Sequence, residues 1–86
     1  MKLLYCKNCE SVFNLTNRLK KCSCGETKGK YVDNRRAWYD GINAIPIGIN
    51  NYSFDLAVKN QKNTGEGNLF KAFITSKNFA DFFKLE

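Results

Sequence analysis

Short apolar runs separated by polar turns dominate the chain, and this pattern predicts small strands rather than long helices. Asn, Asp and Gly bound many of these runs, and all three are typical turn residues. Strands are therefore expected at residues 3–5, 12–15, 30–32, 37–39, 44–49 and 69–75. Pro46 has no N–H group to donate to a neighbouring strand, so it favours an edge or a strand end for the 44–49 segment.

One segment in the middle of the chain has the spacing of a short helix. Phe54, Ala57 and Val58 follow one another at i, i+3 and i+4 and would form one apolar face. Ser53 directly precedes them, and serine is a common N-cap because its hydroxyl accepts a hydrogen bond from a free backbone N–H group. A helix from Ser53 to about Gln61 is therefore predicted.

The tail of the chain carries three phenylalanines at helical spacing. Phe79, Phe82 and Phe83 follow Asn78, which is a second candidate cap. A short helix with such a face most often packs onto the core. Alternatively the three rings are exposed and join two copies of the chain as a homodimer, because exposed apolar patches mark contact sites. Both interpretations stay open at the level of the sequence.

Four cysteines, arranged as two close pairs, are the main chemical feature of the chain. Two residues separate Cys6 from Cys9, and one residue separates Cys22 from Cys24. Structural zinc is held by four ligands in a tetrahedron, and thiolate sulfurs at about 2.3 Å suit it. Each pair would supply two ligands from one tight turn, and Gly25 suits the turn after the second pair. The spacing predicts one structural zinc ion (Zn2+) held by all four cysteines.

Two disulfides, a rubredoxin-like iron site and four unrelated buried cysteines are the alternatives to zinc. A bridge between Cys22 and Cys24 would be strained, and disulfides form in oxidising compartments. Iron sites prefer two intervening residues in both pairs. Only three apolar residues separate Lys2 from Cys6, which is too short for an export signal, and no apolar run reaches the ~20 residues that span a bilayer. A cytoplasmic protein that does not bind membranes is expected.

These elements together predict an α+β fold. A zinc ribbon with four cysteine ligands would occupy residues 1–32 and continue into a small β-rich α+β unit at residues 33–86, with one or two short helices. At 86 residues the two parts should form one compact domain. A core of this size is thin, and small scaffolds often need a metal or another support.

Residue content argues against an enzyme. The chain has no histidine, which is the commonest general base and a usual ligand of hydrolytic zinc. It also has no Gly-rich phosphate loop and no serine in a nucleophile-elbow context. Four cysteines would close the coordination shell of zinc, whereas catalytic zinc keeps one position open. A non-enzymatic binding protein is therefore expected.

The order of motifs resembles that of small zinc-ribbon proteins encoded by bacteria and their phages. The resemblance extends to about Ile74 and rests on the following runs: Tyr5-Cys6-x2-Cys9, Phe13-Asn14-Leu15, Cys22-Ser23-Cys24-Gly25, Tyr31-Val32-Asp33-Asn34, Ala44-Ile45-Pro46-Ile47-Gly48, Ser53-Phe54 and Phe70-x2-Phe73-Ile74. It implies a zinc-bearing domain and, for a phage-encoded protein, the host cytoplasm as its compartment. It implies no activity and no binding residue beyond the four cysteines.

A protein-interaction or inhibitor module is the preferred function. A zinc ribbon presents rigid loops without a large core, so a small protein of this phage-like type could engage a host protein or sequester an anionic ligand such as a nucleotide. The segment 44–49 and the following Asn50, Asn51 and Tyr52 form a candidate ligand-binding lip with amide donors. The simpler interpretation of this segment is an apolar strand that runs into a helix cap.

Nucleic-acid binding is the alternative function. The formal net charge is +6, and zinc bound to four thiolates would lower it by about 2. Basic side chains next to aromatic rings suit phosphate contacts combined with base stacking. The candidate phosphate-binding residues are Arg18, Lys20, Lys21, Arg35 and Arg36. The competing interpretation is that these side chains only solvate the surface of a small ribbon.

The neighbours Trp38 and Tyr39 must point to opposite faces of their predicted strand. We expect Trp38 to be buried against the 69–75 strand, because so large a ring contributes strongly to a small core. Tyr39 should then face outward beside a basic side chain.

Overall fold

The computed structural model describes residues 1–85 and shows a mostly β protein. Within this range the predicted combination of strands and a short helix is confirmed, since there are two four-stranded sheets and one helix. The helix is α1 (Asn51–Lys59), and the strands are β1 (Lys2–Cys6), β2 (Val12–Asn14), β3 (Lys20–Lys21), β4 (Lys28–Tyr31), β5 (Ala37–Asp40), β6 (Ala44–Ile49), β7 (Ala72–Ile74) and β8 (Phe82–Lys84). No helix in residues 1–85 is long and apolar enough to cross a membrane.

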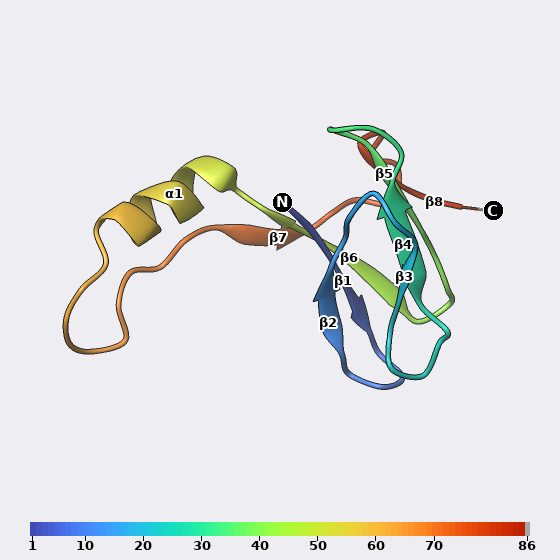
Figure 1. Ribbon diagram of the computed structural model, residues 1–86, viewed down its shortest axis with the longest axis horizontal. Coiled ribbons are helices and arrows are strands. Elements are labelled where there is room, and N and C mark those ends of the chain that lie inside the picture. Colours follow the sequence, from blue (N-terminus) through green and yellow to red (C-terminus); the bar gives the residue numbers. More distant parts are fainter. Residues whose placement is uncertain (86) are drawn as a thin grey trace.

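The strands divide between two sheets that draw on both halves of the chain. Sheet A has the order β2-β1-β6-β7 and is antiparallel, and sheet B has the order β3-β4-β5-β8 with β5 and β8 parallel. Strands from residues 1–32 pair with strands from residues 33–85 in both sheets, as β1 does with β6 and β4 with β5. Figure 1 shows α1 and the loop after it lying to one side of the sheets.

A small apolar core joins the sheets. Its buried members come from β1, β5, β8 and the segment after β2, and they are Leu4, Leu15, Ala37, Tyr39 and Phe82. The rings of Tyr39 and Phe82 meet edge to face, with centroids 5.3 Å apart. So few buried side chains supply limited stability, which makes any additional link between the sheets important.

The predicted orientation of Trp38 and Tyr39 was wrong. Tyr39 is buried at 4% exposure, whereas Trp38 is only half-buried on the opposite face of sheet B. Within sheet B, Trp38 lies directly between Lys30 of β4 and Phe83 of β8. Strand β7, against which Trp38 was expected to pack, belongs to sheet A. Strand alternation held, but burial followed the edge-to-face fit of Tyr39 with Phe82 rather than ring size.

The predicted helix in the tail was also wrong, because Phe82 and Phe83 lie in strand β8. Phe82 is fully buried in the core, Phe83 is half-buried and Phe79 is exposed. The expectation that this group covers the core is therefore confirmed for Phe82. The three rings do not form one exposed stripe, since Phe82 and Phe83 are adjacent in a strand and point to opposite faces.

The middle helix exists, but its N-cap lies three residues earlier than predicted. Asn50 is its N-cap, and its side-chain oxygen accepts a hydrogen bond of 2.8 Å from the backbone N–H of Ser53. Ser53 therefore lies inside the first turn, and the helix ends at Lys59. An asparagine caps as well as a serine does, so the choice between them could not be made from residue type alone.

Two strand predictions also needed correction. Pro46 lies inside β6, opposite Leu4 of β1, rather than in an edge strand. The carbonyl of Pro46 accepts a hydrogen bond from the N–H of Thr75, just after β7. The N–H and carbonyl of one strand residue point to the same side, so the missing N–H of Pro46 would also face β7. The proline therefore removes no hydrogen bond between β6 and β1. The strand expected at residues 69–75 is shorter, because only Ala72–Ile74 pair with β6.

We call residues 51–74, which comprise α1, the following loop and β7, the arm.

Candidate metal centre

Two tight turns at the same end of the two sheets carry the four cysteines. Cys6 is the last residue of β1, and its carbonyl accepts a hydrogen bond of 2.7 Å from the N–H of Glu10. Cys22 follows β3, and its carbonyl accepts a hydrogen bond of 3.1 Å from the N–H of Gly25. The first turn belongs to sheet A and the second to sheet B, so the cysteines lie where the sheets meet (Figure 1).

Both turns require a residue in the left-handed backbone region. Gly25 has φ +82°, which glycine adopts without strain. Glu10 has φ +58° in the corresponding place of the first turn, although a side chain disfavours this conformation. The first turn therefore carries some backbone strain.

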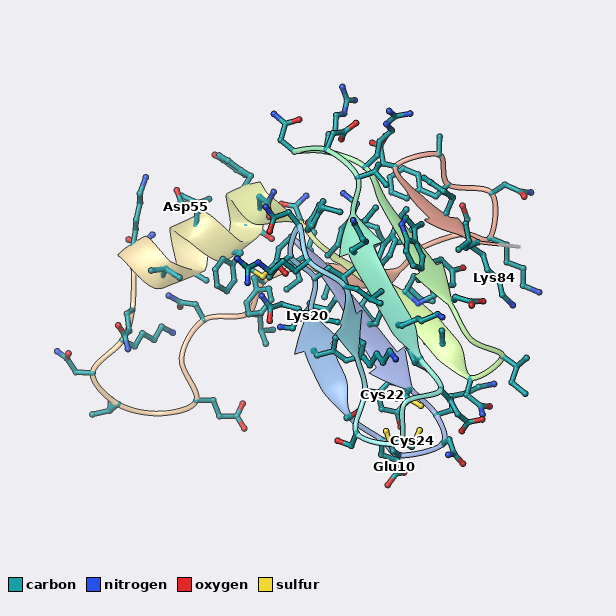
Figure 2. The ribbon with its side chains drawn as sticks, turned by 45° about the vertical axis from the view of Figure 1, so that its right-hand side comes forward. Glu10, Lys20, Cys22, Cys24, Asp55 and Lys84 are labelled. Carbon is teal, nitrogen blue, oxygen red and sulfur yellow. The ribbon has the colours of Figure 1, made fainter. Side chains whose placement is uncertain are left out.

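The four sulfur atoms form a compact group. Every Sγ lies within 4.8 Å of the other three, and the Sγ atom of Cys24 lies 3.8 Å from that of Cys6 and 3.4 Å from that of Cys22. A tetrahedron with zinc–sulfur bonds of about 2.3 Å has edges of about 3.8 Å. The spacing matches a tetrathiolate metal site, whereas a disulfide would need about 2.05 Å. Figure 2 shows Cys22 and Cys24 at this end, beside Glu10.

The cluster combines a buried side with an accessible side. Cys6 and Cys22 are buried, Cys9 is half-buried and Cys24 is exposed. The backbone N–H of Thr27 donates a hydrogen bond of 3.3 Å to the sulfur of Cys22. Burial of two ligands excludes water from the inner half of the site, while the exposed ligand leaves a route for the metal to enter.

Neighbouring donors favour the thiolate form of two cysteines. The hydroxyl of Ser11 lies 3.0 Å from the sulfur of Cys9 and, with the backbone N–H of Cys24, lowers the pKa of Cys9 to about 5. Burial raises the pKa of Cys22, but the backbone N–H of Thr27 and hydrogen bonds with neighbouring thiols lower it further, so the net pKa falls below its usual value. Thiolates are the form that binds metal.

Cys24 shows the opposite shift. The side chain of Asn8 and the backbone of Glu26 lower its pKa, but hydrogen bonding to Cys22 and burial raise it, and the resulting pKa is about 11. A proton shared between adjacent sulfurs explains this division, because several thiolates so close together repel one another. A divalent cation at the centre would replace that proton and neutralise the remaining negative charge.

The four predicted cysteines therefore fit a metal ion, and structural zinc is compatible with their number, geometry and chemistry. Sequence reasoning missed the residues around them. Ser11 and Thr27 contribute donors to the sulfurs, but a serine or threonine near a cysteine pair gives no distinctive signal in a sequence. The bound metal would orient both turns and join sheet A to sheet B.

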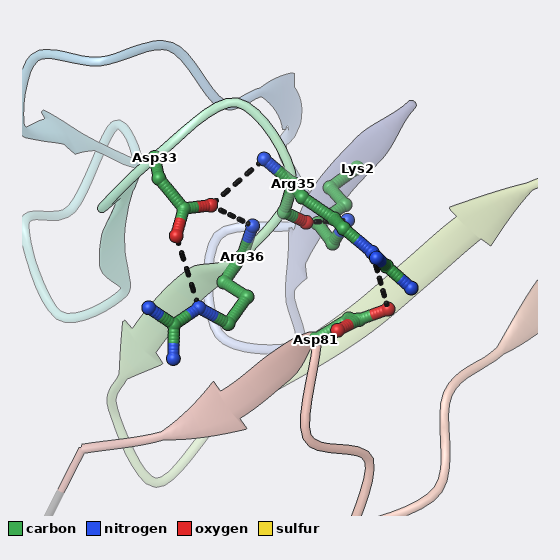
Figure 3. Close-up of polar contacts among 5 residues, drawn as sticks. All are labelled: Lys2, Asp33, Arg35, Arg36 and Asp81. Atoms are coloured by element: carbon green, nitrogen blue, oxygen red, sulfur yellow. Dashed lines mark hydrogen bonds and ion pairs between the residues drawn. The ribbon is translucent and has the colours of Figure 1, made fainter.

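Two of the candidate phosphate-binding residues, Arg35 and Arg36, have acidic partners (Figure 3). Arg36 lies 3.0 Å from Asp33, and Arg35 lies 3.7 Å from Asp81, in both cases from Nε to Oδ2. The carboxylate of Asp33 also accepts hydrogen bonds from two backbone N–H groups, chiefly that of Arg36, and its pKa is lowered to about 2. Asp33 thus organises this turn, and the two arginines have local structural partners.

The other three candidates lie on or beside β3. Lys20 donates to the side chain of Asn14 at 3.1 Å, and Arg18 and Lys21 are exposed. Lys21 pairs directly with Lys28 of β4, so these two side chains share the outer face of sheet B.

Comparisons with protein-family models, with curated proteins and with solved structures found no match to this chain.

Proposed function

We propose that the protein is a non-enzymatic zinc-ribbon module that binds another protein through the arm. The observation that carries this proposal is the exposed apolar surface of residues 51–74. Zinc on the four cysteines would hold the two sheets together, and the sheets would hold the arm in place. The resemblance to zinc-ribbon proteins of bacteria and phages makes a host protein in the cytoplasm the expected partner.

Helix α1 buries no residue against the rest of the protein. Isolated helices of fewer than about 12 residues are marginal in water, and most helices in proteins gain stability by packing an apolar face. Half of the exposed large apolar side chains in residues 1–85 lie in the arm: Tyr52, Leu56, Val58, Leu69, Phe70, Phe73 and Ile74. Exposed apolar side chains concentrated in one segment are typical of an interaction site.

The arm is nevertheless held in one shape by internal contacts. The rings of Phe54 and Phe70 meet edge to face with centroids 4.9 Å apart. The side chain of Asn68 donates a hydrogen bond of 2.6 Å to the carbonyl of Asn60, and the hydroxyl of Ser53 accepts one of 2.9 Å from the backbone of the returning segment. A surface that is ordered before binding loses less conformational entropy on association.

The position of β7 favours a protein as the partner. This strand is at the edge of sheet A, and all three of its residues are exposed. An edge strand offers unpaired backbone groups to an extended segment of another chain. Leu69, at 95% exposure, lies just before it and would enter an apolar pocket of the partner. We therefore expect a partner with an apolar groove beside an exposed strand.

Variants of the arm test this proposal. Leu69→Asp and Phe73→Asp place a charge in the proposed interface, whereas Leu19→Asp changes an exposed leucine outside the arm. Wild-type protein and the three variants, each loaded with zinc, would be immobilised and exposed to lysate of a bacterial host. A protein captured by wild type and Leu19→Asp but lost from both arm variants would be tested again in purified form. Its dissociation constant should rise at least about tenfold with either arm substitution.

Equal capture by all four proteins would contradict a role for the arm. Light scattering of the purified protein supplies an independent check, because a second copy could occupy the same surface. A dimer that Leu69→Asp dissociates would make the partner another copy of this chain and would overturn the proposal of a different protein. The metal content of each variant must equal that of wild type, so that loss of binding reports on the arm.

The non-enzymatic part of the proposal follows from the donor set. Four thiolates would fill the coordination shell of zinc and leave no position for a reacting water. The chain contains no histidine to act as a general base. A hydrolytic screen of the zinc-loaded protein against phosphoester, peptide and glycoside substrates should therefore give only background rates.

A second candidate function, nucleic-acid binding, is supported by the outer face of sheet B. Trp38 lies between Lys30 and Phe83 across three adjacent strands, and Lys28 is two residues from Lys30 on the same face. Aromatic rings beside lysines are the usual surface for single-stranded nucleic acid. These residues differ from the basic residues that were predicted to bind phosphate. Two of the predicted residues, Arg35 and Arg36, are paired with acidic side chains.

Salt dependence tests this second candidate. Binding of a single-stranded oligothymidylate would be measured by quenching of the single tryptophan over a range of salt concentrations. The logarithm of the binding constant should fall with the logarithm of the salt concentration. Replacing Lys28 and Lys30 by alanine should make this slope less steep by about 1.4, at about 0.7 for each lost phosphate contact. Lys59→Ala and Lys62→Ala in the arm are the matched control. No quenching at low salt would reject nucleic-acid binding.

A further inference from the structure

A cavity of about 770 Å³ is lined by residues of both sheets and lies apart from the apolar surface of α1. Its walls come from β6 and β7 of sheet A, from β5 and β8 of sheet B, and from the 75–81 connector that crosses between the sheets. Sites for small molecules usually have volumes of about 300–1,000 Å³ and combine apolar walls with a few polar groups. The size of this cavity falls within that range.

One wall of the cavity is apolar. Ile45 and Pro46 of β6 contribute from sheet A, and Phe83 contributes from sheet B. Ile74 and Phe79 also line the cavity but are 62% and 37% exposed, so the protein itself does not cover them. An apolar body placed here would bury surface that the fold leaves in contact with water, and such burial is favourable.

The charged groups around this wall are all positive. Lys7 follows β1, Lys77 lies in the connector and Lys84 ends β8, so distant parts of the chain converge on one cavity. None of the three makes an ion pair with a described acidic residue, and no acidic side chain within residues 1–85 lines the cavity. Figure 2 shows Lys84 on the side of the molecule opposite Asp55 of α1. The local charge therefore favours an anion.

Thr75 adds a polar group that lacks a partner. It lines the cavity at 7% exposure, and its backbone N–H donates a hydrogen bond of 3.1 Å to the carbonyl of Pro46. Its side-chain hydroxyl is buried and has no hydrogen-bond partner among the described residues. Buried hydroxyls are normally paired, because an unpaired one loses its bonds to water without replacement. Because this hydroxyl is itself inaccessible, it adds a cost to this wall of the cavity without being available to a ligand.

We propose that this cavity binds a small organic anion in which a carboxylate, sulfonate or phosphate is attached to a flat apolar body. The apolar body would lie against Ile45, Ile74 and Phe79, and the anionic group would lie among the three lysines. Binding of this ligand is a separate function from binding of a protein by the arm, although Ile74 belongs to both surfaces.

A pair of aromatic probes with the same body and different charge tests the proposal. Anilinonaphthalene sulfonate carries the anionic group, and N-phenylnaphthylamine lacks it. Fluorescence titrations of the zinc-loaded protein should show that the sulfonate binds at least about tenfold more tightly than the neutral probe. Lys77→Ala combined with Lys84→Ala should remove most of that difference, because each lysine contributes about threefold to fivefold at a partly exposed site.

Three controls assign the binding to the cavity. Lys62→Ala removes an exposed lysine of the arm and should leave both affinities unchanged. Ala80→Phe fills the mouth of the cavity and should weaken both probes about tenfold, and amide chemical-shift changes should map to residues 74–84 rather than to α1. Thr75→Val should raise the melting temperature of the free protein, because it removes an unpaired buried hydroxyl. Equal affinity for the two probes, or shift changes confined to the arm, would overturn the proposal.

Discussion

Removal of the metal ion by a strong chelator should unfold the protein. Cys6 and Cys9 belong to the β1–β2 turn of sheet A, and Cys22 and Cys24 to the β3–β4 turn of sheet B, so a metal ion held by all four would clamp the two sheets at one end. Within residues 1–85 the apolar core between them has five buried members. Structural zinc contributes on the order of 10–16 kcal/mol in small domains, whereas the whole net stability of a domain is about 5–15 kcal/mol. Without zinc, the balance should therefore favour the unfolded chain.

The assay follows metal content and structure in the same sample. Mass spectrometry should find one zinc per chain, and addition of the chelator should abolish near-ultraviolet circular dichroism in a single transition. Excess zinc should restore the signal, which separates loss of the metal from direct denaturation by the chelator. Metal-free protein that keeps its near-ultraviolet signal and its melting temperature would refute the reasoning.

A pair of substitutions in one turn provides the matched comparison. Cys24→Ser removes a candidate metal ligand, whereas Ser23→Ala changes the exposed neighbouring residue, which is not one of the four candidate ligands. The first variant should behave like chelated protein, and the second like wild type. Equal zinc content and equal melting temperature in the two variants would show that Cys24 is not a ligand.

Three further predictions concern the same end of the molecule. Ser11→Ala should lower zinc affinity about tenfold in competition with a chromophoric chelator, since the hydroxyl lies 3.0 Å from a ligand sulfur, whereas Ser23→Ala should not. Glu10 and Gly25 both have positive φ, which glycine adopts more easily than other residues. In urea titrations, Glu10→Gly should therefore raise the free energy of unfolding by up to about 1 kcal/mol, and Gly25→Ala should lower it by about 1–2 kcal/mol. The urea midpoint should fall as the pH is lowered from 8 to 5, because the unfolded chain binds thiol protons that the zinc-bound fold excludes; a flat profile would contradict thiolate ligation.

The metal centre could be predicted from the sequence because its chemistry is local. Each cysteine pair is a short turn in itself, and only four ligands are needed to complete the site. Its supporting groups could not be predicted. Ser11 and Thr27 act through positions that depend on the paths of β2 and β4, and the strained φ of Glu10 has no signature in its residue type.

Most strands were predicted, and so was the antiparallel hairpin of β1 and β2, but the other strand pairings were not. Alternation in the β5 segment required that Trp38 and Tyr39 face opposite sides, yet it did not say which side was the core. That choice depends on Phe82, which is more than forty residues away in the chain and pairs through the parallel β5–β8 contact. The same long-range contact makes the tail a strand, although the spacing of Phe79 and Phe82 suits a helix.

Strand β6 connects the three candidate sites and sets the order in which they can be tested. It begins at Ala44, opposite the ligand Cys6 of β1, and its next residues, Ile45 and Pro46, form a wall of the cavity. It ends at Ile49, directly before the cap of α1, where the arm begins. Because β1 pairs along β6 from Cys6 back to Lys2, loss of the metal should disturb the cavity and the arm together. Binding measured on metal-free protein would therefore report on folding, and only zinc-loaded variants can separate the functions of the two surfaces.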